Sequence, residues 1–217
     1  MLERLKNRMG YETPLGILPG VTTVLRATMN PEKEAHLRRW RHKMDALREA
    51  GHDVDPEEGL KRGRVIDAAI NGWYTYGAWG QIPEGTLGHW RSIMPLVQAF
   101  RATAWQEVIY HPSGYAGTFD AYGSYLDKTH ILIDWKTAKR PQKQEWLEDY
   151  WLQVCAYAQA WEWMGHRVEW IALGIAMPDY RRELHFKRYP NAFIDLWQLR
   201  LEQYQRQSEC LEELPVG

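Results

Sequence analysis

Residues 117–137, GTFDAYGSYLDKTHILIDWKT, form two runs of strand-forming residues around a short turn. Aromatic, aliphatic and β-branched residues dominate both runs, and the SYLDK segment between them has the polar character of a turn. Consecutive strands joined by a short turn pair antiparallel. We therefore predict a hairpin with strands at 114–122 and 129–137, which brings Asp120 close to Asp134.

The second strand of this hairpin places charged residues where burial is expected. Strand alternation puts Asp134 and Lys136 on one face and Trp135 on the other, towards the core. A buried charge is costly unless it is paired or bound to a metal. One interpretation is a simple Asp134–Lys136 pair on a half-exposed strand. The other is a cation site, in which Asp120, Asp134 and Glu107 of the preceding strand supply the hard oxygen ligands that suit Mg²⁺ or Mn²⁺.

The pattern along the rest of the chain extends this hairpin into a single α/β domain. Apolar periodicity predicts helices at 31–50, 57–76, 89–104, 143–164 and 191–207. Alternation and short apolar runs predict further strands at 105–110, 167–177 and 183–189. We expect one domain over 1–217, with a mainly helical part at 1–104, a mixed central β-sheet flanked by helices at 105–190, and a C-terminal helix and tail at 191–217.

The composition is that of a globular chain without a membrane segment. Of the 217 residues, 45% are hydrophobic and 25% are charged, which is typical of globular domains. The net charge of −1 means that any surface for nucleic acid must be a local basic patch. The N-terminal MLERLKNRMG lacks the apolar core of a secretion signal, and the longest apolar run, 170–177, is far shorter than the ~20 residues of a membrane helix. We therefore expect a cytoplasmic protein that does not contact membranes.

Three short motifs follow one another along the chain: Gly117-x-x-Asp120, Asp134-x-Lys136 and Gln153-x-x-x-Tyr157. Each is weak alone; the last, for example, only places two side chains on one face of a helix. The ordered set, with 13 residues between the two aspartates and 16 between the lysine and the glutamine, resembles the PD-(D/E)XK nucleases and most closely their RecB-type branch. The stretch GILPGVTTVLRATM at 16–29 and the Arg62-Gly63 pair further resemble the mitochondrial, bacterial and phage exonucleases of that branch.

The resemblance implies a restriction-endonuclease-like αβββαβ core and hydrolysis of phosphodiester bonds with one or two Mg²⁺ ions. It assigns Asp120 and Asp134 to the metal and Lys136 to orienting the attacking water. It assigns Gln153 and Tyr157 to positioning the water or the scissile phosphate. The iron–sulfur branch of the family uses four cysteines, whereas this chain has two. We therefore expect Mg²⁺ or Mn²⁺ and no iron–sulfur cluster.

The chain departs from the RecB-type pattern at one position. The pattern has a histidine four residues after the glycine of Arg62-Gly63, where the segment RGRVIDAAI places Asp67. This carboxylate either replaces the histidine as a metal ligand or is an acid on the surface of its helix.

Two groups of basic residues are candidates for contacts to phosphates. The first forms either a phosphate track or a solvated helix face, and comprises Arg38, Arg41, Arg62 and Arg64. The second directly follows the strand that carries Asp134, so contact with phosphate is favoured for Lys139, Arg140 and Lys143. Aromatic residues near a glycine-rich loop at 77–88 are candidates for base stacking: Trp73, Tyr74, Tyr76, Trp79 and Trp90.

The sequence thus predicts a Mg²⁺-dependent deoxyribonuclease, and the resemblance implies an exonuclease that favours single-stranded DNA ends, in repair or recombination. Three alternatives stay open: an endonuclease with the same centre, a non-cleaving DNA-binding module, and a subunit that works beside a helicase or a recombination protein. Retention of both Asp120 and Asp134 argues against the module, because a protein without chemistry has no need of two repelling carboxylates.

Overall fold

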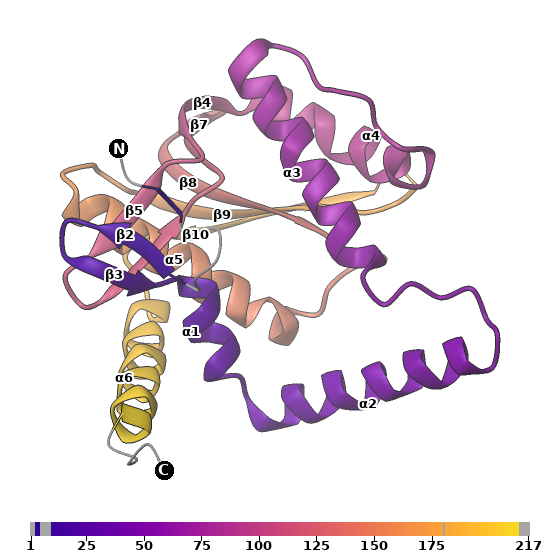
Figure 1. Ribbon diagram of the computed structural model, residues 1–217. Coiled ribbons are helices and arrows are strands. Elements are labelled where there is room, and N and C mark those ends of the chain that lie inside the picture. Colours follow the sequence, from indigo (N-terminus) through magenta and orange to yellow (C-terminus); the bar gives the residue numbers. More distant parts are fainter. Residues whose placement is uncertain (1–2, 5–9, 180, 213–217) are drawn as a thin grey trace.

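The computed structural model describes residues 3–4, 10–179 and 181–212. Five strands form its central sheet: β4 (Arg101–Trp105), β7 (Ala121–Tyr125), β8 (Lys128–Thr137), β9 (Trp170–Ala176) and β10 (Arg182–Arg188). Their order across the sheet is β10-β9-β8-β7-β4 (Figure 1). β8 pairs parallel with β9, whereas the other neighbours pair antiparallel. The predicted mixed sheet is therefore confirmed, with β8 at its centre.

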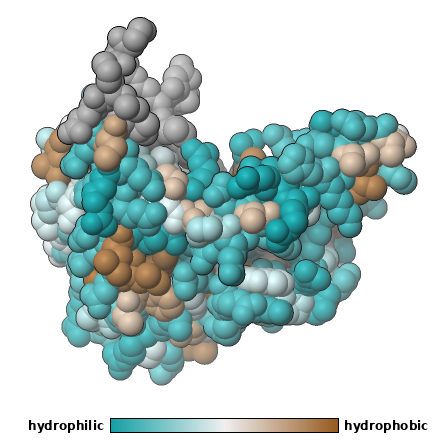
Figure 2. Space-filling model, turned by 90° about the horizontal axis from the view of Figure 1, so that it is seen from below, coloured by the Kyte–Doolittle hydropathy of each residue, from teal (hydrophilic) through white to brown (hydrophobic). Residues whose placement is uncertain are grey.

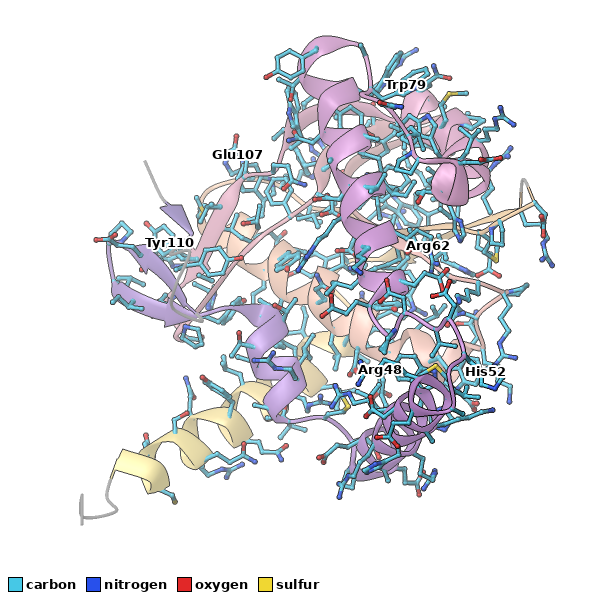
Figure 3. The ribbon with its side chains drawn as sticks, turned by 45° about the vertical axis from the view of Figure 1, so that its right-hand side comes forward. Arg48, His52, Arg62, Trp79, Glu107 and Tyr110 are labelled. Carbon is cyan, nitrogen blue, oxygen red and sulfur yellow. The ribbon has the colours of Figure 1, made fainter. Side chains whose placement is uncertain are left out.

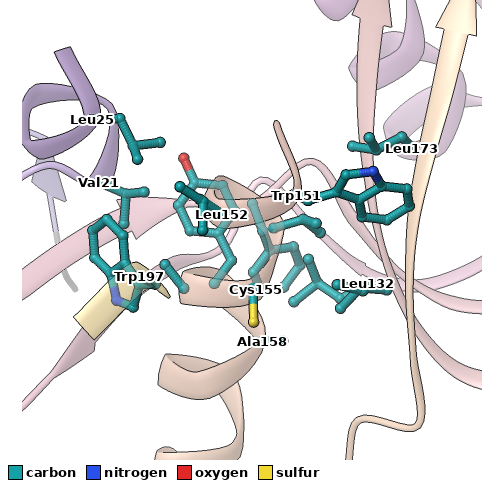
Figure 4. Close-up of a cluster of buried hydrophobic side chains, with 14 of the residues drawn as sticks. Val21, Leu25, Leu132, Trp151, Leu152, Cys155, Ala158, Leu173 and Trp197 are labelled. Atoms are coloured by element: carbon teal, nitrogen blue, oxygen red, sulfur yellow. The ribbon is translucent and has the colours of Figure 1, made fainter. Parts of the chain in front are cut away.

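Helices cover both faces of this sheet. They are α1 (Val21–Ala27), α2 (Pro31–Glu49), α3 (Glu58–Tyr76), α4 (Glu84–Ala99), the 3₁₀ turn η1 (Gln144–Leu147), α5 (Glu148–Trp163) and α6 (Phe193–Glu212). α3 and α4 pack on one face against Ile131, Ile133 and Trp135 of β8. α5 packs on the other face against Leu132 of β8 and Leu173 of β9, with α1 and α6 outside it (Figure 4). Strand alternation thus divides the side chains of β8 between two apolar cores.

Two smaller sheets lie beside the central one. The first comprises β1 (Glu3–Arg4), β2 (Gly10–Thr13) and β3 (Gly16–Pro19), and the second β5 (Val108–His111) and β6 (Tyr115–Thr118). The part predicted as mainly helical, 1–104, therefore also contains strands. The end of the predicted C-terminal tail, 213–217, lies outside the described residues.

Two of the predicted strands are each divided in the structure. The strand predicted at 105–110 is split between β4 and β5 at Gln106, whose φ of 51° turns the chain. The strand predicted at 114–122 is split between β6 and β7 at Phe119 and Asp120. Because of these breaks, β4 and β7 join the central sheet while β5 and β6 pair with each other. Alternation within a strand carries no information about such a change of partner.

The third predicted helix, 89–104, is displaced in the structure, where α4 spans Glu84–Ala99. The helix begins directly after Pro83 and has Glu84 in its first turn. These residues are a helix-start signal, which apolar periodicity does not include. The residues RATAW at 101–105 form β4 because they pair with β7. Strand pairing therefore outweighs the helix propensity of their alanines.

The helix α2 projects from the body of the protein as an arm (Figure 1). None of its residues is buried, and Trp40, on the predicted apolar side, is 39% exposed. Seen from below, the arm is mainly hydrophilic (Figure 2). The periodicity predicted the helix correctly, but its apolar side is only partly covered, since Leu37, Met44 and Leu47 are half-buried and Trp40 is exposed. None of the helices in the described ranges combines the length and apolarity that crossing a lipid bilayer requires.

Gly174 in β9 makes room for the tryptophan of the Asp134-x-Lys136 motif. Trp135 pairs with Gly174 across the parallel ladder of β8 and β9 and is 8% exposed. A Cβ atom on Gly174 would lie 2.2 Å from Cζ3 of the Trp135 ring. The absence of a side chain at this position therefore allows the indole to lie flat on the sheet, and the indole fixes the strand from the face opposite the two charged residues.

Replacing Gly174 with alanine is expected to lower the free energy of unfolding by roughly 1–3 kcal/mol, the usual cost of overpacking a core. Urea unfolding followed by tryptophan fluorescence measures the change. Gly80→Ala is the matched control, because the added methyl group would meet nothing within 4 Å. Equal stability of the two variants would contradict the contact between Gly174 and Trp135.

Candidate active site

A cleft of about 540 Å³ lies at the end of β8, between α3 and α5. Its polar lining comes from β2 (Tyr11), α1 (Thr22), α3 (Arg64 and Asp67), the turn at Gln106, the segment around the break between β6 and β7 (Thr118 and Asp120), β8 (Asp134, Lys136 and Thr137) and α5 (Tyr150, Gln153 and Tyr157). The structure therefore collects all five residues predicted as catalytic in one cleft, although they span three motifs.

The hairpin of β7 and β8 brings Asp120 to Asp134 as predicted. The ladder between these strands ends at the pair Ala121–Ile133, while β8 continues beyond it. There the Trp135 backbone N–H donates a hydrogen bond to Asp120 Oδ2 at 2.7 Å. The Asp120 side chain thus takes the place of a strand neighbour, which holds its carboxylate near that of Asp134, a side chain only 1% exposed.

Lys136 lies against the same pair of acids. Its Nζ is 2.6 Å from Asp134 Oδ2 and 5.2 Å from the centre of the Tyr150 ring. Lys136 is the one partner that this buried oxygen has within the described residues. Asp134 Oδ2 therefore has an ion-pair partner but retains lone pairs that a further cation could take.

Burial and mutual repulsion together raise the pKa values of the cleft acids. Burial raises the Asp120 pKa well above its ordinary value, and the charges of Asp134 and Asp67 raise it further. Burial also raises the Asp134 pKa, although Lys136 opposes this effect. Burial lowers the Lys136 pKa, but the neighbouring aspartates outweigh it and leave this pKa raised. The three acids outnumber the two basic side chains of the cleft, Lys136 and Arg64, which favours an additional cation.

Asp67 stands on the wall of this cleft. Its Oδ1 accepts a hydrogen bond from Gln106 Nε2 at 3.2 Å, and its side chain remains open to solvent. Desolvation by the surrounding cleft raises its pKa, and Asp134 raises it further. Asp67 thus lies on the exposed surface of α3 and in the wall of the cleft at once, so both interpretations of this residue stay open.

Glu107, in contrast, is not brought to the cleft. It is exposed in the break between β4 and β5, and its side chain points outward (Figure 3). Its backbone carbonyl accepts a hydrogen bond from Phe119 N at 3.3 Å. The left-handed turn at Gln106 explains the error, because it interrupts the alternation from which the position of Glu107 was predicted. Gln106 lines the cleft in its place.

Gln153 and Tyr157 form a hydrogen-bonded pair on α5. Gln153 Nε2 donates to the Tyr157 hydroxyl oxygen at 3.0 Å. Burial raises the pKa of Tyr157 well above its ordinary value, and the charge of Asp134 raises it further, so the phenol keeps its proton. A Cβ atom on Gly117 would lie 2.4 Å from Cε1 of the Tyr157 ring. The glycine of the first motif therefore allows the tyrosine of the last motif to reach the cleft.

Several lining residues were not predicted. Tyr150 precedes Gln153 and Tyr157 by three and seven residues, so helical periodicity would have placed all three on one face of α5. Tyr11 had no such signal, since β2 lies far from the motifs in sequence. It reaches the cleft because β2 packs beside β6, where the Thr118 hydroxyl donates to the Tyr11 hydroxyl oxygen at 3.5 Å.

The basic residues predicted at the start of α3 have different surroundings. Arg64 lines the cleft and is exposed. Arg62 is buried, and its guanidinium pairs with Glu58 at 3.2 Å (Figure 3). Glu58 also pairs with Lys139 Nζ at 2.7 Å. Arg62 is thus not available at the surface, while Lys139 and Arg64 are.

The other predicted basic residues lie on exposed segments. Arg140 and Lys143 flank the Trp146 ring, at 5.7 Å and 5.4 Å from its centre. Arg38 and Arg41 are exposed on the arm, where Arg38 pairs with Glu34 at 3.4 Å. None of these four residues lines the cleft, so any contact with a long substrate would be outside it.

The predicted base-stacking residues are not brought to the cleft either. Trp79 packs between Trp73 and Trp90, with ring centres 5.6 Å and 5.2 Å away. Trp90 is buried, and Tyr74 donates to the Val97 carbonyl at 3.4 Å. These residues join α3 to α4, whereas Tyr76 is exposed at the end of α3.

Comparisons with known proteins agree with the resemblance carried by the motifs. The chain is 26% identical to mitochondrial genome maintenance exonuclease 1 of Xenopus tropicalis and of Mus musculus, over 91% and 89% of its own length. It spans about three fifths of these relatives, 60% and 61% respectively. No known protein-family profile matches the chain.

Solved structures of exonucleases are also similar. An alkaline exonuclease from Laribacter hongkongensis has a TM-score of 0.43 and 13% identity, covering 88% of this chain and 87% of its own. A phage-related exonuclease from Haemophilus somnus has a TM-score of 0.46 and 12% identity, covering 88% and 93%. At these TM-scores and identities, the solved structures carry no conclusion about function, which is inferred from the cleft residues.

Replacing Asp120 with asparagine is expected to stabilise the protein in EDTA by about 1 kcal/mol at pH 8, because it removes a repelled charge while keeping an acceptor for Trp135 N–H. The folded-state pKa of Asp120 is raised, so folding gains from its protonation. That contribution is lost as pH rises above the ordinary value of 3.8 through the raised pKa. The advantage of the variant should therefore shrink as the pH is lowered towards 5.

Urea unfolding at both pH values measures this difference. Asp127→Asn is the control, since Asp127 lies in the exposed turn of the same hairpin, and its pKa is lowered by hydrogen bonds from its backbone and from Lys128. An Asp120→Asn variant no more stable than wild type at pH 8 would show that the acids do not repel as described.

Proposed function

We propose that the chain is a Mg²⁺-dependent DNA exonuclease that acts on single-stranded ends. The hydrogen bond from Trp135 N–H to Asp120 carries this proposal, because it holds a second acid beside buried Asp134, which pairs with Lys136. Two acids and a lysine in one cleft suit the hydrolysis of an anionic ester. The similarity to curated exonucleases supports DNA as the substrate, and the family resemblance of the motifs is the basis for single-stranded ends.

Mg²⁺ or Mn²⁺ is the proposed metal, with Asp120 and Asp134 as ligands and Asp67 nearby. The buried Asp134 Oδ2, whose one partner in the described residues is Lys136, and the raised pKa values of the acids both support a cation here. Among the described residues, no three His, Cys, Asp or Glu side chains converge into a complete metal site. This fits Mg²⁺, which commonly takes one or two carboxylates and keeps waters or substrate phosphates as its other ligands.

When bound, the metal would neutralise phosphate charge and lower the pKa of a water molecule. The side chains supply the remaining interactions. The Lys136 ammonium orients the attacking water and offsets charge that develops on the phosphate oxygens. Because the Tyr157 oxygen already accepts from Gln153, its own proton is directed to a further acceptor, such as a phosphate oxygen in the cleft.

The proposed substrate path leaves the cleft past basic side chains. Arg64 lies in the cleft wall, while Lys139, Arg140 and Lys143 lie on the segment that follows β8. The arm adds Arg38 and Arg41. These side chains are exposed, as a local phosphate track on a near-neutral chain requires.

Replacing Lys136 with alanine is expected to reduce the shortening of labelled linear single-stranded DNA at least about a hundredfold, because it removes the group that orients water and offsets charge. The assay uses 5′- and 3′-labelled strands with Mg²⁺ and with EDTA. Lys128→Ala is the matched control, since Lys128 begins the same strand and lies over Trp170, outside the cleft.

Each result of this assay decides between the functions considered. Mg²⁺-dependent shortening that is lost in Lys136→Ala but kept in Lys128→Ala would support the exonuclease. Cleavage of a circular single strand would identify an endonuclease. An inert wild type on single strands, duplex and RNA would exclude a free-standing nuclease and favour a binding module or a subunit of a larger complex.

Replacing Arg64 with alanine is expected to weaken binding of a single-stranded oligonucleotide and to reduce the slope of log Kd against log salt by about 0.7, the value for one phosphate contact on a single strand. Fluorescence anisotropy in EDTA measures both quantities. Lys61→Ala is the control, because Lys61 lies one turn earlier on α3 and pairs with Asp55 at 2.7 Å. Equal slopes for the two variants would exclude Arg64 from the path.

A further inference from the structure

The arm α2 needs an anchor, because it buries no residue of its own. Its first turn is held by Asn30, which accepts a hydrogen bond from Glu32 N at 2.9 Å, but this bond lies within the helix start. The link to the body is an ion pair between Lys33 in the first turn of α2 and Asp149 in the first turn of α5. The position of this contact therefore depends on where Asp149 is held.

The C-terminal helix α6 holds Asp149 in place. Arg200 of α6 is 9% exposed, and its guanidinium lies 3.6 Å from Asp149 Oδ1. Arg200 Nε also donates to the Thr28 hydroxyl oxygen at 2.7 Å, and its Nη2 donates to the Leu25 carbonyl at 2.9 Å. Arg200 thus contacts both the end of α1 and the start of α5. The arm follows α1 in the chain, and its first turn pairs with the start of α5 through Lys33.

This arrangement differs from an ordinary surface ion pair. Exposed pairs contribute little because both side chains must be ordered and water screens them. Here Asp149 is only 18% exposed and is already ordered by Arg200, so Lys33 alone has to be fixed. Thr28, the residue that ends α1, donates in turn to the Val24 carbonyl at 2.8 Å, so the end of α1 belongs to the same network.

We propose that the chain of contacts Arg200–Asp149–Lys33 sets the position of the arm relative to the cleft, with Arg200 and Asp149 as positioning residues for the single-strand path. The use of the arm by DNA rests on the proposed function; its anchoring does not. The anchor also adjoins the cleft, because Asp149 is followed by Tyr150, whose ring contacts Lys136. The C-terminal helix therefore acts on substrate binding without touching the substrate.

The first test measures the position of the arm directly, without DNA or metal. Spin labels are placed on exposed positions by His42→Cys on the arm and Glu202→Cys on α6, in a Cys210→Ser background that leaves only buried Cys155. Pulsed electron resonance should give one narrow distance distribution. Lys33→Met and Asp149→Asn should broaden or shift this distance distribution. Lys33→Arg keeps a positive charge for Asp149 and should give the distribution of the wild type.

Arg48→Met is the matched control for this experiment. It removes one positive charge from the same helix and breaks a pair with Asp45 that lies wholly within the arm. Lys33 is exposed, so Lys33→Met is not expected to affect folding. The test therefore does not depend on a substitution of buried Arg200. If Lys33→Met and Asp149→Asn gave the same distribution as Arg48→Met, the proposed anchor would be refuted.

The second test asks whether the anchor serves the substrate. Lys33→Met and Asp149→Asn should weaken single-strand affinity in EDTA by roughly threefold to tenfold, as loss of a few phosphate contacts would. Lys33→Met should raise KM and leave kcat unchanged, since Lys33 lies on the arm and not in the cleft, and Lys33→Arg should keep the KM of the wild type. A fall in kcat with unchanged KM would overturn the positioning role, whereas failure of the exonuclease proposal would leave the distance result intact.

Discussion

One hydrogen bond sets the geometry on which the rest of the site depends: the Trp135 N–H to Asp120 Oδ2 contact at 2.7 Å. It forms because β7 stops pairing with β8 at Ala121–Ile133, while β8 is still held on its other side by β9 as far as Thr137. A carboxylate thereby completes the edge of a strand and is fixed close to buried Asp134. Two acids that would otherwise separate are kept together by the backbone of the sheet.

The positions around this contact are set by packing on both faces of β8. Trp135 packs towards α3 and α4 over Gly174, so the strand cannot rotate to move Asp134 and Lys136 away from α5. On the other face, Gly117 leaves the space that the Tyr157 ring occupies. The glycines thus matter through the side chains that they admit. The acids and the lysine thus lie on a strand that is packed on both faces, whereas the proposed substrate path runs over exposed segments and the arm.

Much of this arrangement could be predicted from the sequence because local patterns determine it. The hairpin, the alternation of β8 and the shared face of Gln153 and Tyr157 follow from periods of two and of nearly four residues. Glu107 was misplaced because a single left-handed residue, Gln106, changes the strand partner without changing the alternation. Tyr11 and the Arg200 contacts had no local signal at all, since they depend on β2 and α6, which are distant in sequence. The exposure of the arm could not be predicted either, because amphipathic periodicity indicates a helix but not the element on which it packs.

The central claim is that the cleft acids form a binding site for a divalent cation. Isothermal titration of Mg²⁺ into metal-free protein tests it most directly, with Asp134→Asn as the comparison. The account predicts saturable binding to the wild type and its loss in the variant, because Asp134 supplies a buried oxygen whose one partner in the described residues is Lys136. Heats no larger than dilution in the wild type, or equal binding by both proteins, would contradict it.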